Sequence, residues 1–581
     1  MEEYIMAFVV LPGADASGNG NDWTANNINN TDTSSTTYDI MTDVPTLTDE
    51  DTANFATLNS LSSYASGTDG NLQTATVNQG AIWSTSLGTV PLPNSGKYYW
   101  EITAQVDIYN IVGIIPTNLY NTVGTASYLG GPNFPKGKGY TGINGGMYEN
   151  GGFTAGFGAA FTAGDVIGLR ADMDTRTVYW YKNNVLQGSR TLDAGVEYVP
   201  ATSRYSSSYN TWNFGQRPFK YTPPAGYLKL NTFNLPDSSI VDGSENMNAV
   251  TYTGNGGTQS ITNVGFSPDL IWTKDRDAAI SHILNDSVRG VSKTLYSNLT
   301  NAEANYPGFN VTSFNSDGMT VGDNSAGAYG SNGLSKNYVA WNWKAGGTAV
   351  SNTDGTITSQ VSANTTAGFS VVTYTGTGSA ATVGHGLGVA PSMVIVKWRS
   401  SAGGSWATWH SSFVTASNTD YLLLDSNGAK GFAGSLLFWN NTIPTSSVFS
   451  IGTNAGLNTN TGTYVAYCFA DVEGYSKFGS YTGNGSTDGT FVYTGFRPAY
   501  IMIKGTSTSS WVIIDNKRNG YNVVEPYVLA DSPNAESSTY TVADFLSNGF
   551  KMRSTAVHNA SGQTWIYMAF AENPFKNSLA R

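Results

Sequence analysis

The chain has 581 residues, which predicts about four domains at ~100 to 200 residues each. Charged residues make up 12% of it, against ~25% in a typical soluble protein, so helix-favouring Lys, Glu and Arg are scarce. Thr, Ser, Asn, Gly and Tyr are abundant instead, which favours strands and tight turns, and we predict an all-β, multi-domain fold. The net charge of −12 argues against a nucleic-acid partner, because phosphate backbones bind basic surfaces.

Residues 1–45 form the first predicted segment, one apolar strand from Tyr4 to Leu11 followed by a Gly, Asn and Thr-rich stretch. Because it is too short and polar to bury a core, we predict that it docks on a neighbouring protein and anchors the chain. Asp15 to Gly20 matches the first half of a calcium loop, but Asn26 stands where the bidentate Glu belongs. We therefore interpret this stretch as a turn and predict no metal site.

No stretch of the sequence reaches the ~18 to 20 apolar residues of a membrane span, and Glu2 and Glu3 stand where a secretory signal carries basic residues. We therefore expect a soluble protein made in the cytoplasm and not exported by the secretory route. The single cysteine, Cys468, excludes an internal disulfide and a multi-cysteine zinc site. It lies in an apolar stretch and is interpreted as a small buried hydrophobe.

From residue 46 to 222 the pattern becomes one of strands separated by regular turn signals. Val178 and Trp180 alternate with polar residues, which indicates a half-buried sheet, and Asn183-Asn184 is typical of a hairpin turn. Four phrases of this region resemble a SPRY domain: Gly96-Lys97-Tyr98-Tyr99-Trp100-Glu101, Gly164-Asp165-Val166-Ile167-Gly168, Trp180-Tyr181-Lys182-Asn183-Asn184 and Asn213-Phe214-Gly215-Gln216-Arg217-Pro218-Phe219. This resemblance implies a bent β-sandwich that binds through its loops and carries no catalytic residues.

A linker is predicted at residues 223–246, and three similar segments follow it, at 247–347, 348–475 and 476–581. Each contains Tyr-Thr-Gly, then a proline with a lysine six positions later, then a closing aromatic strand. The corresponding residues are Tyr252, Pro268, Lys274 and Trp343; Tyr374, Pro391, Lys397 and Phe469; Tyr481, Pro498, Lys504 and Phe570. We predict three β-sandwich modules with the same strand order, arranged in an extended string.

The three repeated lysines, Lys274, Lys397 and Lys504, follow apolar strands. They could form a shared ligand contact, but we expect them at the exposed ends of their strands, because long cationic side chains usually reach water.

Catalytic residues are hard to assemble from this sequence. The four histidines, His282, His385, His410 and His558, occupy no common place in two repeats and form no triad or zinc pattern. Asp172 and Asp174 share a strand face, which could serve glycoside hydrolysis in a groove, but a solvated turn is the simpler interpretation. We predict no catalytic residue, no metal and no cofactor, and therefore no enzyme.

Aromatic side chains are the stronger signal, since Phe, Trp and Tyr make up 13% of the chain. Flat apolar faces with polar edges suit contact with sugars and proteins, although many such rings also fill the cores of β-sandwiches. Tyr128, Phe134, Tyr140, Tyr148 and Phe153 gather in one Gly-rich stretch, in which we expect Tyr140 and Tyr148 to be exposed. The residues that we predict to bind a partner are Tyr140, Tyr148, Trp406 and Trp409.

The combination of a SPRY-like region, Pro223-Pro224-Ala225-Gly226-Tyr227 and the Tyr-Thr-Gly modules resembles bacteriophage virion proteins, particularly tail and fibre proteins. The resemblance implies a homo-oligomeric virion component, assembled in the host cytoplasm, with other virion proteins and a host-surface receptor or polysaccharide as partners. We expect a tail fibre or appendage subunit. The alternatives are a head decoration or adaptor protein with a purely structural role and, less favoured, a polysaccharide depolymerase.

Overall fold

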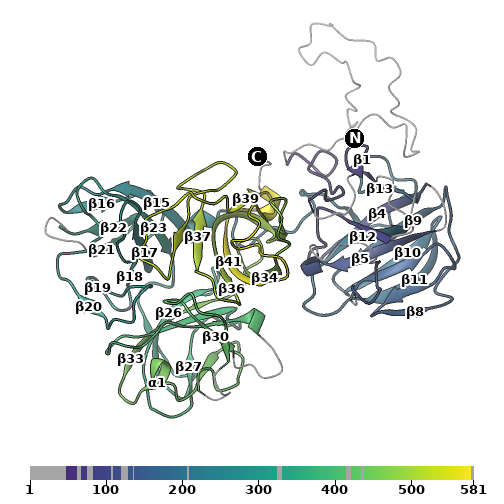
Figure 1. The fold of residues 1–581 in the computed structure, drawn as a ribbon. Coiled ribbons are helices and arrows are strands. Elements are labelled where there is room, and N and C mark those ends of the chain that lie inside the picture. The colour runs from purple at the N-terminus through teal and green to yellow at the C-terminus, as the bar shows by residue number, and fades with distance from the viewer. Residues whose placement is uncertain are drawn as a thin grey trace, which may run out of the picture. The chain divides into compact units, whose positions relative to one another are not determined.

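The computed structural model describes residues 47–61, 67–74, 83–105, 109–119, 128–134, 136–205, 208–323, 330–413, 420–432 and 437–577. The chain divides into two compact units, Met1–Pro236 and Asp237–Arg581, and the boundary falls within residues 223–246 (Figure 1). Nearly all regular structure in the described ranges is β, which confirms the predicted fold class. None of the described helices is long and apolar enough to cross a membrane. The predicted anchoring segment and its calcium-like turn lie outside the described residues.

The N-terminal unit is a sandwich of two antiparallel sheets, except that its last short strand pairs parallel to a neighbour. The larger sheet has the order β1 (Gly67–Thr68), β2 (Gln73–Thr74), β13 (Asn210–Asn213), β4 (Lys97–Ala104), β9 (Val166–Asp172), β10 (Thr177–Lys182), β11 (Val185–Thr191), with β14 (Leu228–Lys229) beside β4. The smaller sheet has the order β3 (Trp83–Leu87), β12 (Tyr198–Tyr205), β5 (Asn110–Pro116), β6 (Lys138–Thr141), β7 (Met147–Glu149), β8 (Gly152–Thr154).

Residues of the sequence motifs quoted above connect the two sheets and turns of this sandwich. Trp180 is fully buried and its Nε1 donates to Val112 O at 3.0 Å, which links the two sheets. Glu101 is buried and accepts hydrogen bonds from Lys220 N and Tyr221 N at 2.8 and 2.9 Å, which fixes the chain after the last long strand. Asn183 and Asn184 both have positive φ, as the predicted hairpin turn requires.

The second unit contains three copies of one strand arrangement. In copy 1 the main sheet has the order β15 (Met247–Thr253), β23 (Asn337–Trp343), β17 (Leu270–Asp275), β18 (Ile283–Asp286). In copy 2 the same order is β26 (Phe369–Thr375), β33 (Thr463–Phe469), β28 (Met393–Trp398), β29 (Ala407–His410), β30 (Asp420–Leu423), β31 (Gly431–Phe432), extended beyond β26 by β25 (Ser359–Asn364) and β24 (Val350–Asn352). In copy 3 it is β34 (Ser476–Thr482), β41 (Thr564–Pro574), β36 (Phe496–Gly505), β37 (Val512–Asp515), β38 (Val528–Leu529).

Each copy adds a small second sheet, and these also correspond. They are β16 (Gln259–Ile261), β22 (Gly318–Val321), β21 (Val311–Asn315) in copy 1; β27 (Ala381–Gly384), β32 (Val448–Ile451) in copy 2; and β35 (Phe491–Tyr493), β40 (Gly549–Met552), β39 (Ala543–Leu546) in copy 3. Copy 1 also has the pair β19 (Lys293–Thr294) and β20 (Ala304–Asn305), and copy 2 has the short helix α1 (Ala455–Asn458). In every copy the closing aromatic strand lies between the Tyr-Thr-Gly strand and the lysine strand. The predicted common strand order is therefore found.

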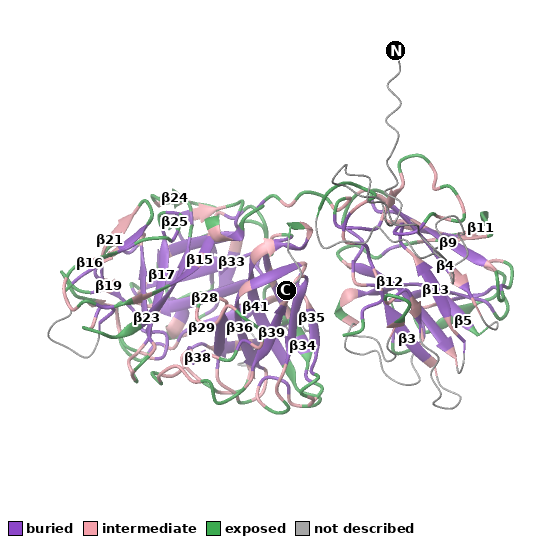
Figure 2. Ribbon diagram, turned by 90° about the horizontal axis from the view of Figure 1, so that it is seen from above, coloured by how far each residue is buried: buried purple, intermediate pink, exposed green. Residues whose placement is uncertain are grey.

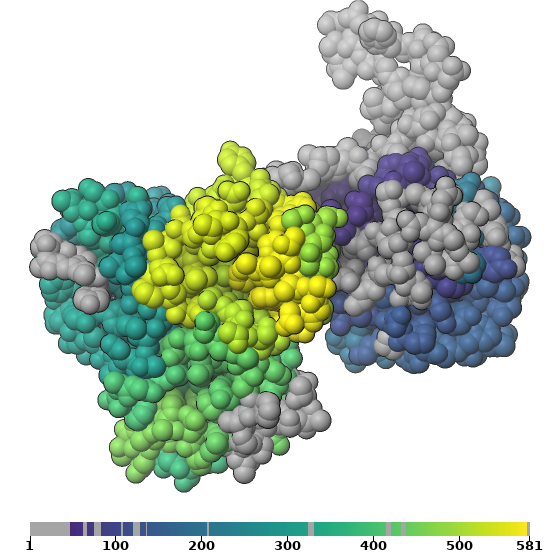
Figure 3. Space-filling view, in the orientation of Figure 1, coloured from purple at the N-terminus to yellow at the C-terminus, as the bar shows by residue number. Residues whose placement is uncertain are grey.

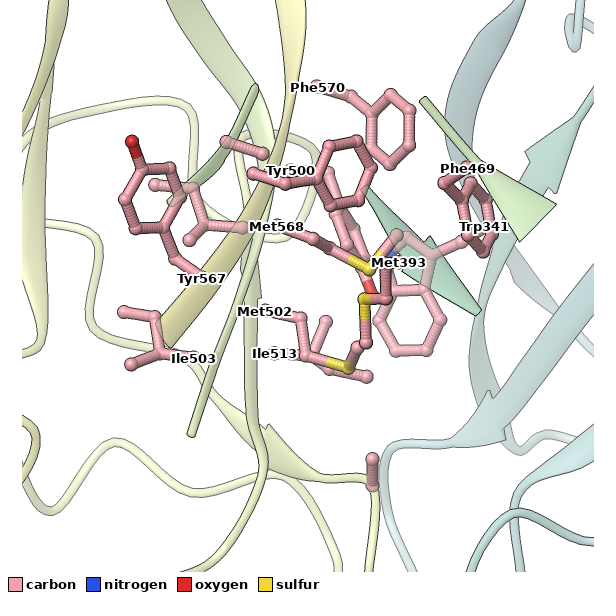
Figure 4. Packing of buried hydrophobic residues seen from close by; sticks show 14 of the residues in the cluster. Trp341, Met393, Phe469, Tyr500, Met502, Ile503, Ile513, Tyr567, Met568 and Phe570 are labelled. Carbon is pink, nitrogen blue, oxygen red and sulfur yellow. The ribbon is translucent and has the colours of Figure 1, made fainter. Parts of the chain in front are cut away.

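The three copies share one hydrophobic core, so they are not a string of separate modules as the sequence led us to expect. The last aromatic residues of the three closing strands, Trp343, Phe469 and Phe570, form a triangle with ring-centroid distances of 5.9, 6.1 and 6.3 Å. Figure 4 shows part of this cluster, with Trp341 of copy 1, Met393 of copy 2 and Tyr500 of copy 3 packed together. In Figure 3 the teal, green and yellow copies abut one another directly. The three closing strands therefore meet at this triangle.

Three equivalent backbone contacts close the copies into a ring. Glu303 N donates to Arg399 O of copy 2, Lys430 N to Thr506 O of copy 3, and Glu536 N to Arg276 O of copy 1, at 2.8, 2.8 and 2.9 Å. Each acceptor lies two positions after a repeated lysine. Because copy 3 returns to copy 1, the unit has no free terminal module. Figure 2 shows that buried residues fill the strands and that exposed residues gather in the connecting segments.

Candidate functional site

The repeated lysines do not form a surface, and the prediction of exposed strand ends is wrong. Lys274, Lys397 and Lys504 are completely buried. Their Nζ atoms donate to backbone carbonyls of the following loop, as Lys504 does to Gly505 O at 2.7 Å and also to Gly428 O of copy 2 at 2.9 Å. Burial lowers the pKa of each lysine to about 8. These side chains therefore hold loops, and they are not available to a ligand.

The Tyr-Thr-Gly motif is structural as well. The three tyrosine hydroxyls donate to backbone carbonyls of the loop before the closing strand, at Ser331, Leu457 and His558, with distances of 2.6, 2.8 and 2.6 Å. The glycines allow the same loop to approach, because a Cβ on Gly254, Gly376 or Gly483 would lie 2.2 to 2.4 Å from a carbonyl oxygen of that loop. The most conspicuous repeat of the sequence thus encodes the fold and not a binding site.

The titratable residues weighed from the sequence are separate and buried. His282, His385 and His410 each place a ring nitrogen 2.9 to 3.2 Å from a backbone oxygen. Burial lowers the pKa of all four histidines, that of His410 to about 4 and that of His558 to about 3. Within the described ranges, no group of three or more His, Cys, Asp or Glu could hold a metal ion.

The two paired carboxylates stabilise turns. Asp172 pairs with Lys97 at 2.9 Å and accepts Thr175 N, while Asp174 accepts Gly96 N at 2.8 Å. Burial raises the pKa of Asp172, but its bonds to Lys97 and Thr175 outweigh this and the pKa lies below the usual value. Cys468 is buried, and burial raises the pKa of its thiol to about 12.

Three of the four aromatic residues predicted to bind a partner are buried. Tyr140, expected to be exposed, has no exposed surface, because β6 lies between β5 and β7 and its ring packs on Phe157 and Phe161. Trp406 donates its Nε1 to Tyr296 O of copy 1 at 2.9 Å, which makes it part of a junction between copies. Trp409 is 4% exposed and packs in the core of copy 2.

Tyr148, by contrast, lies in a continuous row of six aromatic rings on the N-terminal unit. Successive ring centroids along this row are 4.9 to 5.7 Å apart. None of the six is buried; the two ends of the row, Tyr109 and Phe153, are 39% and 44% exposed, and the four rings between them are partly buried. We call this row the aromatic belt, and its members in contact order are Tyr109, Tyr205, Trp83, Tyr128, Tyr148 and Phe153.

Glycines and strand ends position the belt. The ring of Phe153 lies over Gly146, where a Cβ would come within 2.2 Å of it, and Gly130 has φ +71° where a Cβ would strike Tyr148 O. Trp83 and Tyr205 are partners in the register of β3 and β12, which brings their rings together. The belt contains only aromatic side chains, and the nearby Glu149 is paired with Arg190 at 3.1 Å.

Sequence reasoning found half of this belt and missed the rest. Tyr128, Tyr148 and Phe153 come from the Gly-rich aromatic stretch, which was the right signal. Trp83, Tyr109 and Tyr205 come from three distant strands or strand ends, and only the sheet order brings them together. Partly exposed aromatic rings of this kind offer large rigid contact areas with polar edges, which suits recognition of a protein or a sugar.

Fold and surface together define an all-β protein with an N-terminal sandwich that carries a row of partly exposed aromatic rings, followed by a closed three-copy unit. A family model described as a domain of unknown function, DUF7483, matches residues 242–574, more than half of the chain. The protein belongs to this family, and the matched region spans nearly the whole three-copy unit.

Part of the chain is similar to SPRY domains of known structure. The human SPRY domain (18% identity, TM-score 0.22) covers 26% of this chain and 94% of its own, and the SPRY domain of human HERC1 (21%, 0.20) covers 25% and 97%. The TRIM65 PSpry domain (15%, 0.22) covers 27% and 89%. A stretch of 79 residues is 38% identical to the E3 ubiquitin-protein ligase RKP of Arabidopsis thaliana, and it spans 13% of this chain and 6% of that protein.

Proposed function

We propose that this protein is a non-enzymatic subunit of a bacteriophage tail fibre or appendage, and that it contacts the host surface through the aromatic belt of its N-terminal unit. The observation that carries the proposal is the belt itself. Six aromatic side chains in mutual contact, none of them buried, are costly to leave facing water unless a partner covers them.

The choice of a virion role rests on the sequence resemblance to phage tail and fibre proteins and is supported by the build of the second unit. Its repeated lysines, tyrosines and glycines all serve loops and junctions, which suits a durable structural part. The non-enzymatic role is supported by the dispersed, buried histidines and by the structural use of Asp172 and Asp174.

A head decoration or adaptor protein is the second candidate. It is favoured by one observation, that the repeated lysines, tyrosines and glycines of the second unit all have a structural use. Under that proposal the belt would bind another virion protein and not the host.

Immunogold electron microscopy of particles of the encoding phage, with antibody against the whole protein, distinguishes these roles. We expect gold at the distal part of a tail appendage. Gold spread over the head shell would favour the decoration role. Particles that lack the protein altogether, shown by mass spectrometry of purified virions, would refute both.

A further inference from the structure

One buried arginine of the N-terminal unit has no acidic partner among the described residues. Arg204, on β12, has no exposed surface, and its Nη1 donates to Ser86 Oγ at 3.0 Å. Its Nε and Nη2 have no hydrogen-bond acceptor, and among the described residues no carboxylate pairs with it. Burial lowers the pKa of Arg204 to about 10, so the guanidinium still carries its charge at neutral pH.

This arrangement is unusual for a buried charge. An isolated cation in a protein interior is strongly unfavourable, and native folds pair it with an acid or a bound ion. Of the other arginines of this unit, Arg190 and Arg217 pair with carboxylates, whereas Arg170 and Arg176 donate to Asn184 Oδ1 and Val196 O. Arg204 differs from all four because it has no exposed surface and no acidic partner among the described residues.

Two polar atoms that follow Arg204 in the chain are also unpaired. Ser208 Oγ and Asn210 Oδ1 are also buried without a partner, where the chain crosses from β12 in one sheet to β13 in the other. Asn210 Nδ2 donates to Thr202 Oγ1 at 2.8 Å, and Thr202 is the register partner of Ser86, which Arg204 contacts. Asn210 and Arg204 are thus connected through Thr202 and Ser86.

The free edge of Arg204 selects the kind of ligand. Nε and Nη2 lie side by side on one edge of the planar guanidinium, and their two N–H bonds point in parallel. This edge can donate two parallel hydrogen bonds to two oxygens of one carboxylate or phosphate. A spherical ion such as chloride does not offer two separate acceptor atoms. The hydroxyl of Ser208 can donate a third hydrogen bond, and Asn210 Oδ1 can accept one from a hydroxyl or a water beside the ligand.

We propose that the surroundings of Arg204 in the N-terminal sandwich form a binding site for a small oxyanion, held bidentately by Arg204 with Ser208 as a further donor. The site is distinct from the aromatic belt. Arg204 and Tyr205 are consecutive on β12, so their side chains point to opposite faces of the sheet, Arg204 inward and Tyr205 outward. The proposal is therefore independent of the host-binding role.

Thermal unfolding of the whole protein tests the site with acetate and phosphate as probes and chloride as the reference salt, all at the same ionic strength. We expect 100 mM acetate or phosphate to raise the midpoint of the N-terminal unit by about 4 °C or more over chloride. Arg204→Met should remove this difference. Arg190→Met, which affects an arginine already paired with Glu149, should keep it.

Crystals grown with selenate provide a test that does not depend on a variant that folds. We expect an anomalous selenium peak within hydrogen-bonding distance of Arg204 Nε and Nη2. An adventitious ion elsewhere on the surface, without a peak at Arg204, would overturn the proposal. Equal midpoints in all salts would do the same.

Discussion

Glu303 is the residue at which the closed three-copy ring can be tested most sharply. It lies at the junction of copies 1 and 2, where its carboxylate contacts Arg289 Nη1 at 3.1 Å and Arg399 Nε at 2.9 Å. Arg289 is fully buried and also pairs with Asp286. Replacing Glu303 with Gln keeps the shape of the side chain and leaves one cation of this cluster without its partner.

The expected loss follows from the burial of the cluster. Breaking a buried ion pair by removing one partner costs ~3 to 5 kcal/mol. Because the side chains of Glu303 and Arg399 are 12% and 20% exposed, solvent offsets part of this, and we expect a loss of about 3 kcal/mol in the free energy of unfolding. The loss has a pH dependence. Burial raises the pKa of Glu303, but Arg399 and Arg289 outweigh it and hold the pKa below its usual 4.5. The stability from this pair is thus complete above about pH 4.5 and is lost as the pH falls further.

Lys430 is the matched control, because it occupies the equivalent backbone position at the junction of copies 2 and 3. Its side chain is 27% exposed and pairs with Asp420, so Lys430→Arg, which keeps the charge beside Asp420, should cost about 1 kcal/mol or less. The assay is urea unfolding of the whole protein, monitored by tryptophan fluorescence, for both single variants and for Arg399→Met alone and combined with Glu303→Gln. Strict additivity of the Glu303 and Arg399 changes, or equal losses for Glu303→Gln and Lys430→Arg, would refute the reasoning.

Three further predictions concern buried groups and the belt. Lys504→Met should lower the unfolding free energy by about 2 to 3 kcal/mol, because it leaves buried carbonyls without a donor. The same change at the exposed Lys517 should cost under about 0.5 kcal/mol in the same urea titration, and equal costs would contradict the buried role of Lys504. Burial lowers the pKa of His410 to about 4 in the folded protein, so as the pH falls His410 is protonated in the unfolded chain before it is protonated in the folded one. The free energy of unfolding should therefore fall by about 3 kcal/mol as the pH drops from 6.5 to 4. A His410→Gln variant whose pH profile over that range matches the native one would argue against this assignment. Tyr140→Ala should lower the free energy of unfolding by about 3 to 5 kcal/mol, and Tyr148→Ala should lower it by about 1 kcal/mol or less. A larger loss for Tyr148→Ala than for Tyr140→Ala in calorimetry would contradict the assignment of Tyr140 to the core and Tyr148 to the surface.

The strand order of the three copies could be predicted because the sequence repeats the signals that set it. The Tyr-Thr-Gly, lysine and closing aromatic positions keep their register, and alternation within each strand assigns its faces. Ring closure could not be predicted. The contacts that close it, such as Arg276 with Glu536 at 2.7 Å, join residues from opposite ends of the unit and have no local signal.

The errors have a common physical origin. Lysine is usually exposed, but Lys274, Lys397 and Lys504 each find buried carbonyls that replace water, and a single sequence does not show such partners. Tyr140 and Tyr148 share a Gly-rich stretch, but Tyr140 pairs with Met147 across β6 and β7, so Tyr148 lies on the opposite face of the sheet. Only this register separates the buried ring from the partly exposed one. The oxyanion site had no signal either, since Arg204 becomes unusual only when its neighbours in space are known.

Binding of the purified whole protein to cells of the host bacterium is the most direct test of the proposed role. The decisive comparison is between the native protein, the belt variant Tyr128→Ser with Tyr148→Ser, and Tyr521→Ser, which changes an 81% exposed tyrosine of the second unit. We predict at least a ~10-fold weaker affinity for the belt variant, with a melting temperature lowered by no more than ~4 °C, and unchanged binding by Tyr521→Ser. Equal affinity of all three proteins for the cells would contradict recognition by the belt.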